Sequence, residues 1–290
     1  MLSLVLPKGS LEQATLDLFD AADLSVRRGS NRDYHAVVDD PRIDRVRFLR
    51  PQEIPQYVEQ GLFDLGITGR DWIAETDAEV VSLGELQYSK ATGDPVRVVL
   101  AVPKEAPWHR AAELPEGIRI STEFPALTRR YLDQHGVKAV VVPSYGATEA
   151  KVPDIVDAIV DLTETGSSLR KNGLRILDTL LTSYTELIAN HAAHAVPEKR
   201  AAMEDILLLL GGAVRARRHV LVKLNVAVAD LAAVLAVMPA ATSPTLMPLA
   251  TGEHSAVEAV VPKATVNTLI PALKSAGGFD ILELPISKIV

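Results

Sequence analysis

Short apolar runs alternate with segments of helical spacing along the first part of the chain. The apolar runs predict strands at 2–6, 46–49, 63–68 and 96–102. Helical spacing and a closing glycine predict helices at 11–22 and 52–60. Strands that alternate with helices are typical of an α/β fold built on a parallel sheet.

The same alternation continues in the middle of the chain. It predicts strands at 118–121, 139–142 and 155–162, with a helix at 125–135. These segments indicate a second α/β lobe with a parallel sheet. A strand or turn at 174–177, a strand at 185–190 and a long helix at 197–216 then lead back towards the first lobe.

The last part of the chain has a different order of elements. It predicts strands at 219–227, 245–249, 256–261 and 280–286, and helices at 230–238 and 266–276. The order βαββαβ is that of a ferredoxin-like domain. The segment contains no evident catalytic grouping, so we expect this domain to serve regulation or assembly.

The stretch 153–170, PDIVDAIVDLTETGSSLR, combines a buried strand with a small polar turn. Glycine lets a ligand approach the backbone, and the hydroxyls can donate to an anion beside a helix N-terminus. Asp161 at the strand end adds a carboxylate that suits sugar hydroxyls, so the stretch fits a phosphorylated sugar. It also fits a plain capped helix, with Asp157 as a hydrogen-bonded polar group.

Further candidate ligand groups follow other predicted strands. Lys8 lies in the turn PKGS after the first strand, and Arg50 ends the strand 46–49. Lys8 is equally well explained as a solvated lysine. FDLGITGRDWI (63–73) echoes VDAIVDLTETGSSL (156–169), because both have Thr-Gly between a strand and a helix. The echo indicates two lobes that each present an anion-friendly turn to one cleft.

Composition narrows the class of protein. The chain has 290 residues, 48% of them apolar, a net charge of −7 and no cysteine. Length favours two or three domains, and net negative charge argues against a nucleic-acid surface. Thiolate catalysis and zinc–thiolate sites are excluded. The N-terminus lacks the features of a signal peptide and the apolar runs are too short to span a membrane, so we expect a cytoplasmic location.

Five segments resemble ATP phosphoribosyltransferase in its long form. They are LPKGSL, FLRPQEIPQYVEQGLFDLGITGRDW, PVRVVLAVP, DAIVDLTETGSSLRKNGLRIL and a C-terminal domain with SPTLMPLA. The resemblance implies two periplasmic-binding-protein-like lobes, with lobe I at 1–93 and 176–212 and lobe II at 94–175. It also implies an ACT-like ferredoxin domain at 213–290, histidine as feedback inhibitor, and a homohexamer built from dimers.

The implied reaction joins N1 of ATP to the ribose of phosphoribosyl pyrophosphate (PRPP), releases pyrophosphate and needs Mg²⁺. The ribose carbon passes through an oxocarbenium-like state, which a carboxylate stabilises by charge. On this resemblance Asp157 and Asp161 hold the ribose hydroxyls, with Asp161 favoured. The remaining implied contacts are Thr163, Glu164, Thr165, Gly166, Ser167 and Ser168 for PRPP, and Lys8, Arg50, Thr68, Gly69 and Asp71 for ATP or its polyphosphate.

Two departures from the family pattern concern positive charge. Many members have an arginine after Lys-Gly where this chain has Ser10, and many have Gly-x-Cys-Arg where it reads LGELQYSKATGDPVR (83–97). Lys90 or Arg97 is a possible source of the second charge. The metal ligands are not assigned, since the substrate and water can hold Mg²⁺.

Thr242, Ser243 and Thr245 lie in the loop that matches the histidine site, although a structural turn explains them equally well. An alternative function is an intracellular two-lobed regulator that binds a small anion and senses a ligand through its C-terminal domain. The sequence shows no evident pair of DNA-binding helices for such a regulator.

Overall fold

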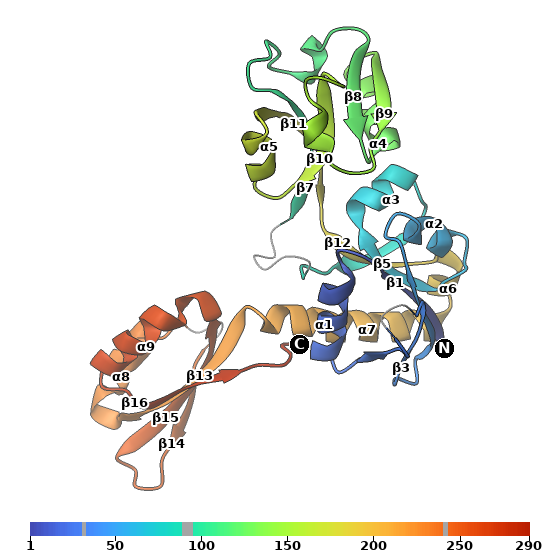
Figure 1. Ribbon diagram of the computed structural model, residues 1–290. Coiled ribbons are helices and arrows are strands. Elements are labelled where there is room, and N and C mark those ends of the chain that lie inside the picture. The colour runs from blue at the N-terminus through green and yellow to red at the C-terminus, as the bar shows by residue number, and fades with distance from the viewer. Residues whose placement is uncertain (31–32, 89–94, 240–242) are drawn as a thin grey trace. The chain divides into compact units, whose positions relative to one another are not determined.

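The computed structural model describes residues 1–30, 33–88, 95–239 and 243–290 (Figure 1). Packing divides the chain into two units. One consists of Met1–Asp17 and Leu24–Leu207, and the other of Leu18–Asp23 and Leu208–Val290. The first unit contains two sheets, each the centre of one lobe, and the second unit contains one sheet. None of the helices in these described ranges is long and apolar enough to cross a bilayer.

The sheet of the first lobe has the strand order β2-β3-β4-β1-β5-β12-β6. Its strands are β1 (Leu2–Pro7), β2 (Val26–Arg27), β3 (His35–Val38), β4 (Ile43–Leu49), β5 (Leu65–Gly69), β6 (Val81–Glu85) and β12 (Thr185–Ala189). β1 runs parallel to β4 and β5, so the carboxyl ends of these three strands lie at one edge. Leu4, Val5 and Leu6 of β1 are fully buried, as expected for a strand covered on both faces.

Short helices follow the strands of the first lobe. They are α1 (Glu12–Ala21), α2 (Ile54–Glu59), α3 (Arg70–Thr76) and α6 (His191–Ala195), and α7 (Pro197–Ala216) comes after them. α2 packs its apolar side on the sheet, where Ile54 and Val58 contact Val5 and Ile188. Burial of each such side chain stabilises the fold by about 1.5–3 kcal/mol.

The sheet of the second lobe has the order β11-β7-β10-β8-β9. Its elements are β7 (Val96–Pro103), β8 (Ile118–Thr122), α4 (Pro125–Gln134), β9 (Ala139–Pro143), β10 (Ala158–Thr163), α5 (Ser167–Lys171) and β11 (Leu174–Ser183). β8 runs parallel to β9 and β10, whereas β7 runs antiparallel to β10 and β11. The predicted parallel pairing is therefore confirmed for β8, β9 and β10, and β7 and β11 add antiparallel strands to the sheet.

The antiparallel strands carry the chain into and out of the second lobe. Ser183 at the end of β11 pairs with Val96 at the start of β7, and Thr163 at the end of β10 pairs with Arg97. Tyr184 then leads into β12, whose first residue, Thr185, pairs with Gly69 at the end of β5. Because of this register, the carboxyl ends of the parallel strands in both lobes lie beside the crossing at Ser183–Thr185.

The second unit has a four-stranded antiparallel sheet in the order β14-β15-β13-β16. Its elements are β13 (His219–Ala227), α8 (Leu231–Val237), β14 (Thr245–Pro248), β15 (His254–Pro262), α9 (Val266–Ser275) and β16 (Phe279–Pro285). Figure 1 shows α8 and α9 on the same face of this sheet. Leu224, Val257 and Leu273 are fully buried between the helices and the sheet. The predicted ferredoxin-like fold is confirmed.

The sequence patterns missed some strands and misplaced the ends of others. The strand predicted at 155–162 begins only at Ala158, because Ile155 is 62% exposed and lies outside the sheet. β2, β3 and β6 were not predicted, since these short strands are partly exposed and lack a continuous apolar run. β11 is ten residues long rather than a short strand or turn at 174–177.

Candidate active site

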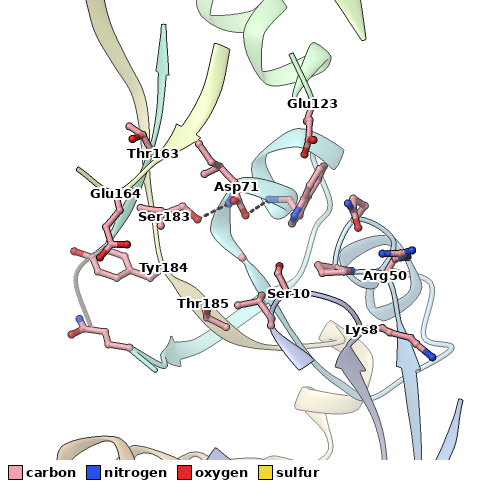
Figure 2. Close-up of a pocket in the computed structure, with 18 residues that line it drawn as sticks. Lys8, Ser10, Arg50, Asp71, Glu123, Thr163, Glu164, Ser183, Tyr184 and Thr185 are labelled. Carbon is pink, nitrogen blue, oxygen red and sulfur yellow. Dashed lines mark hydrogen bonds between the residues drawn. The ribbon is translucent and has the colours of Figure 1, made fainter. Parts of the chain in front are cut away.

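A cavity of about 330 Å³ lies where the strand ends of the two lobes meet. Figure 2 shows Lys8, Ser10 and Arg50 of the first lobe on one side and Thr163 and Glu164 of the second lobe on the other. The other lining residues are Leu11, Pro51, Gln52, Gly69, Asp71, Trp72, Gln87, Val96, Glu123, Leu162, Ser183, Tyr184 and Thr185. Ligand groups at the carboxyl ends of strands are the usual arrangement of open α/β sheets.

Two basic side chains of the first lobe line the cavity. Lys8 follows β1, and its ammonium lies 3.9 Å from the centre of the Tyr34 ring. Gly9 has a φ of +97°, and a β-carbon there would lie 3.5 Å from Nη1 of Arg50. The guanidinium of Arg50 therefore lies against the Lys8–Gly9–Ser10 turn. Ser10 contributes only a short, uncharged side chain to this turn.

The turn between β5 and α3 contains a buried carboxyl group. Asp71 is 4% exposed, its carboxylate accepts the backbone N–H of Trp72 at 2.9 Å, and its own backbone N–H donates to Ser183 Oγ at 3.1 Å. Burial raises the pKa of Asp71 to about 6. Thr68 is fully buried and donates its hydroxyl to the Pro51 carbonyl at 2.9 Å, so this hydroxyl already has a partner, and Thr68 does not line the cavity.

The turn after β10 holds its own backbone in place with hydroxyl groups. Thr163 Oγ1 accepts the N–H of Gly166 at 2.8 Å, and Thr165 Oγ1 accepts the N–H of Ser167 at 3.3 Å. Gly166 adopts a φ of +71°, which favours glycine. Ser168 donates its hydroxyl to a carboxylate oxygen of Glu149. Of the six residues of this turn, Thr163 and Glu164 line the cavity, and the other four do not.

Asp161 lies two residues before Thr163, so both side chains lie on the same face of β10. Its carboxylate accepts the backbone N–H of Leu162 at 2.8 Å. Burial raises the pKa of Asp161 to about 6, and the nearby charges of Glu149 and Glu123 add to the rise. Asp161 is therefore a partly desolvated carboxylate that directly precedes Leu162, a residue of the cavity lining.

Asp157 does not lie at the cleft. It comes directly before β10, about 20 Å of extended chain from the turn at the other end of the strand. Its carboxylate forms an ion pair with Arg119 at 2.7 Å and accepts that residue's backbone N–H at 2.9 Å, and the side-chain hydrogen bond from Arg119 lowers the pKa of Asp157. The structure thus places Asp157 in a surface ion pair at the opposite sheet edge.

Some residues that line the cavity were not predicted from the sequence. Glu123 follows β8, and the rule that ligand groups follow parallel strands would have found it. Ser183 and Tyr184 lie in the crossing between the lobes, where only the register of β11 and β12 reveals their place. Gln52 and Gln87 lie in segments quoted above, but neither was assigned a role from the sequence.

The remaining predictions concern the histidine site, the additional positive charge and the metal ligands. Ser243 and Thr245 are exposed at and just before the start of β14, and Thr242 lies outside the described residues, as does Lys90. Arg97 lies in β7 and is not among the residues that line the cavity. Within the described residues, no group of three or more histidine, aspartate or glutamate side chains is arranged to hold a metal ion.

Comparisons with known proteins agree with this architecture. The model of the ATP phosphoribosyltransferase family matches residues 50–212, and that of the HisG C-terminal domain matches residues 216–288. The ATP phosphoribosyltransferase of Solibacter usitatus is 49% identical over 290 residues, covering 100% of this chain and 99% of that protein. The enzyme of Desulforudis audaxviator is 47% identical over 289 residues, with coverage of 100% and 99%.

A solved structure supports the same fold. The ATP phosphoribosyl transferase (HisG:HisZ) complex from Thermotoga maritima matches with a TM-score of 0.61 at 28% identity, covering 73% of this chain and 97% of that chain. The two α/β lobes with a polar cavity at their strand ends, the family match and the named relatives together assign the chain to the class of phosphoribosyl-transferring enzymes.

The chain belongs to the ATP phosphoribosyltransferase family, in its long form. It is the first enzyme of histidine biosynthesis and uses ATP and PRPP as substrates. The alternative of a non-enzymatic regulator is set aside, because the relatives that match this chain over its full length are named as the enzyme.

Proposed function

We propose that the cleft between the two lobes joins N1 of ATP to C1 of PRPP to form N1-(5-phosphoribosyl)-ATP. The new bond links adenine N1 to the ribose carbon, and the bond from that carbon to pyrophosphate breaks with its electron pair leaving on pyrophosphate. The observation that carries this assignment is the register, which brings Thr163 and Glu164 at the start of the turn after β10 to the same cavity as the Lys8 and Arg50 side chains.

Asp161 is the proposed catalytic carboxylate. Positive charge develops at C1 and the ring oxygen as pyrophosphate leaves, and a carboxylate in a poorly solvated place stabilises that charge strongly. Asp161 is such a group, since burial raises its pKa to about 6 and leaves it ionised at neutral pH. Adenine N1 is a neutral nucleophile, so the mechanism needs no separate strong base.

PRPP is proposed to bind along the turn after β10. Thr163, Thr165, Ser167 and Ser168 supply hydroxyls for the 5′-phosphate, and Gly166 lets the ligand approach the backbone. Ser168 would exchange its Glu149 partner for a phosphate oxygen. Glu164 lines the cavity beside this turn.

ATP is proposed to bind on the side of the first lobe. Lys8 and Arg50 can contact its polyphosphate, and Arg50, which lies against Gly9, would supply the charge that Ser10 lacks. Gly69 and Asp71 border the cavity beside the base or ribose. Thr68 would act through the position of β5, because its hydroxyl is bonded to Pro51.

Mg²⁺ is proposed as the cofactor, carried by the phosphates of the substrates. The residues fit this role, since Mg²⁺ usually binds one or two carboxylates together with phosphates and water. Glu123 lines the cavity and Asp161 lies behind it, which offers carboxylates without an all-protein cage. Bound there, Mg²⁺ would neutralise charge on the departing pyrophosphate.

Regulation by histidine, a homohexamer built from dimers and a cytoplasmic location complete the proposal. The match of residues 216–288 to the C-terminal domain of the family supports a regulatory role for the ferredoxin-like unit. Ser243 and Thr245 are the described candidates for histidine contacts. Replacement of both by alanine should weaken histidine inhibition and leave uninhibited turnover unchanged.

The test is pyrophosphate release from PRPP and Mg-ATP, measured with and without histidine. Release that needs both substrates and falls with histidine supports the reaction and its regulation. Release that histidine does not affect would remove the regulatory part of the proposal. Failure to release pyrophosphate, with both ligands bound, would contradict the catalytic assignment.

A further inference from the structure

The loop after β9 places a lysine beside the proposed PRPP site. Residues Thr148–Lys151 form a 3-10 helix between β9 and β10. The ammonium of Lys151 donates to Ser144 Oγ at 2.5 Å and to Ser121 Oγ at 3.4 Å. These contacts place one positive charge at the carboxyl ends of β8 and β9.

The two serines that accept from this ammonium are buried, and one of them is hydrogen-bonded to a further hydroxyl. Ser121 is 1% exposed and Ser144 is 4% exposed, and Ser144 shares a hydrogen bond of 2.8 Å with the buried hydroxyl of Thr148. Such groups have little freedom to move, so they fix the position of the ammonium. An ammonium has three N–H donors, and the two serine contacts occupy two of them.

The strand register relates Lys151 to Asp161. Ser121 is the parallel partner of Ile159, so their side chains lie on one face, and Asp161 lies two residues further along the same face. The ammonium on Ser121 is therefore next to the carboxylate proposed to act at the ribose. The charge of Lys151 also lowers the pKa of Asp161, against the larger effect of burial.

The 3-10 helix contacts the phosphate turn as well. Glu149, two residues before Lys151, accepts the hydroxyl of Ser168 in that turn. No carboxylate of the described ranges lies within ion-pair distance of Lys151, although Glu123 and Glu149 also carry charge near Asp161. A ligand with several negative charges would therefore meet three carboxylates here unless a cation offsets them.

We propose that Lys151 is a substrate-binding residue that contacts a phosphate group of PRPP from the platform formed by Ser121 and Ser144. The proposal rests on the proposed function, because it takes PRPP to bind at the turn after β10. The phosphate group is either the 5′-phosphate, which the turn would hold, or the pyrophosphate at C1 beside Asp161.

Lys151→Gln tests this role without removing the support for the fold, since the glutamine amide can still donate to the serine hydroxyls. We expect the KM for PRPP to rise about tenfold to a hundredfold, as for the loss of a charged hydrogen bond. The KM for ATP should not change, and Lys151→Arg should recover most of the loss. Lys138→Gln is the matched control, because Lys138 is an exposed lysine of the same lobe, paired at 3.5 Å with Glu116.

Calorimetry with Mg²⁺ distinguishes the two phosphate groups. Weaker binding of ribose 5-phosphate by the Lys151→Gln variant, with pyrophosphate unchanged, assigns the 5′-phosphate. The reverse result assigns the pyrophosphate. A variant that melts earlier but keeps the native KM for PRPP and both affinities would show that Lys151 only joins strand ends, and would overturn the proposal.

The same assay keeps this proposal separate from the proposed function. Native enzyme that releases pyrophosphate only with both substrates upholds the reaction whatever the variant does. An unchanged variant beside an active native enzyme overturns the role of Lys151 alone. An inactive native enzyme that binds neither ribose 5-phosphate nor pyrophosphate would overturn both.

Discussion

The turn after β5 and the turn after β10 share a Thr-Gly pair before a helix, yet they differ in charge. In the first, the buried carboxylate of Asp71 accepts the N–H of Trp72 in the first turn of α3. In the second, neutral hydroxyls of Thr163 and Thr165 accept the corresponding turn amides. A helix N-terminus attracts an anion. The first turn supplies its own anion, whereas in the second only neutral hydroxyls bond the turn amides, and it is there that we propose a phosphate of the substrate binds.

The glycines of the two turns, Gly69 and Gly166, also differ in backbone conformation and in what surrounds them. Gly69 has an extended backbone with a φ of −83°, and a β-carbon there would meet Asp71 Oδ1 at 2.1 Å. Gly166 has a φ of +71°, and a β-carbon there would meet only the end of Arg170 and Ile176 at 3.1 and 3.3 Å. One glycine makes space for an internal carboxylate, and the other allows a turn that other residues resist. Similar sequence therefore does not imply the same ligand.

Asp161→Asn should have the largest effect on turnover. The substitution keeps the shape of the side chain and removes the charge that we propose stabilises the ribose in the transition state, so we expect kcat to fall about 100-fold or more. The melting temperature should not fall, because the native carboxylate is destabilised by burial. Steady-state pyrophosphate release and a thermal melt measure both effects. Native kinetics in this variant would remove Asp161 from the mechanism.

The pH dependence sharpens the assignment of that carboxylate. The pKa of Asp161 is raised to about 6, so the group loses its charge as the pH falls through 6. We expect kcat/KM for PRPP to be constant above pH 7 and to fall about tenfold per pH unit well below pH 6. This inflection should be absent from the residual activity of Asp161→Asn. If it persists there, another group such as Asp71 controls the profile.

Much of the fold and part of the site followed from sequence. Buried strands such as β1 and the βαββαβ order were recognisable because apolar runs and helical spacing mark them directly. The cleft depended on register, which no local pattern contains, so Ser183 and Tyr184 were missed. Asp157 was assigned to the ribose, although it precedes β10 at the end away from the cavity and pairs with Arg119. Thr68 lay in the expected turn, but the direction of its hydroxyl depended on Pro51 of another strand end.

A pair of alanine substitutions separates the two turns. Gly166→Ala forces an alanine into a left-handed conformation that costs about 1–2 kcal/mol, so the KM for PRPP should rise about tenfold. Gly69→Ala has no such strain, but it displaces the Asp71 carboxylate from Trp72 and should raise the KM for ATP instead. Measurement of both KM values for both variants tests the division of substrates. Equal effects on the two substrates would contradict it.

Asp71→Asn should have the smallest effect on turnover, because asparagine can accept the same backbone N–H near a helix start. We expect kcat to change by less than about threefold and the pH inflection of kcat/KM for PRPP to remain.

The folding stability of the Asp71→Asn variant should respond more clearly. Burial raises the pKa of Asp71 from 3.8 to about 6, so between these values the folded state binds more protons than the unfolded chain. Folding stability therefore decreases as the pH rises from 4 to 6, by up to about 3 kcal/mol for this group. The variant lacks that loss and should gain stability over the native protein at pH 8 but not at pH 4, in denaturant titrations at both values. An equal difference at the two pH values would show that Asp71 is not the buried, self-supplied anion of the first turn.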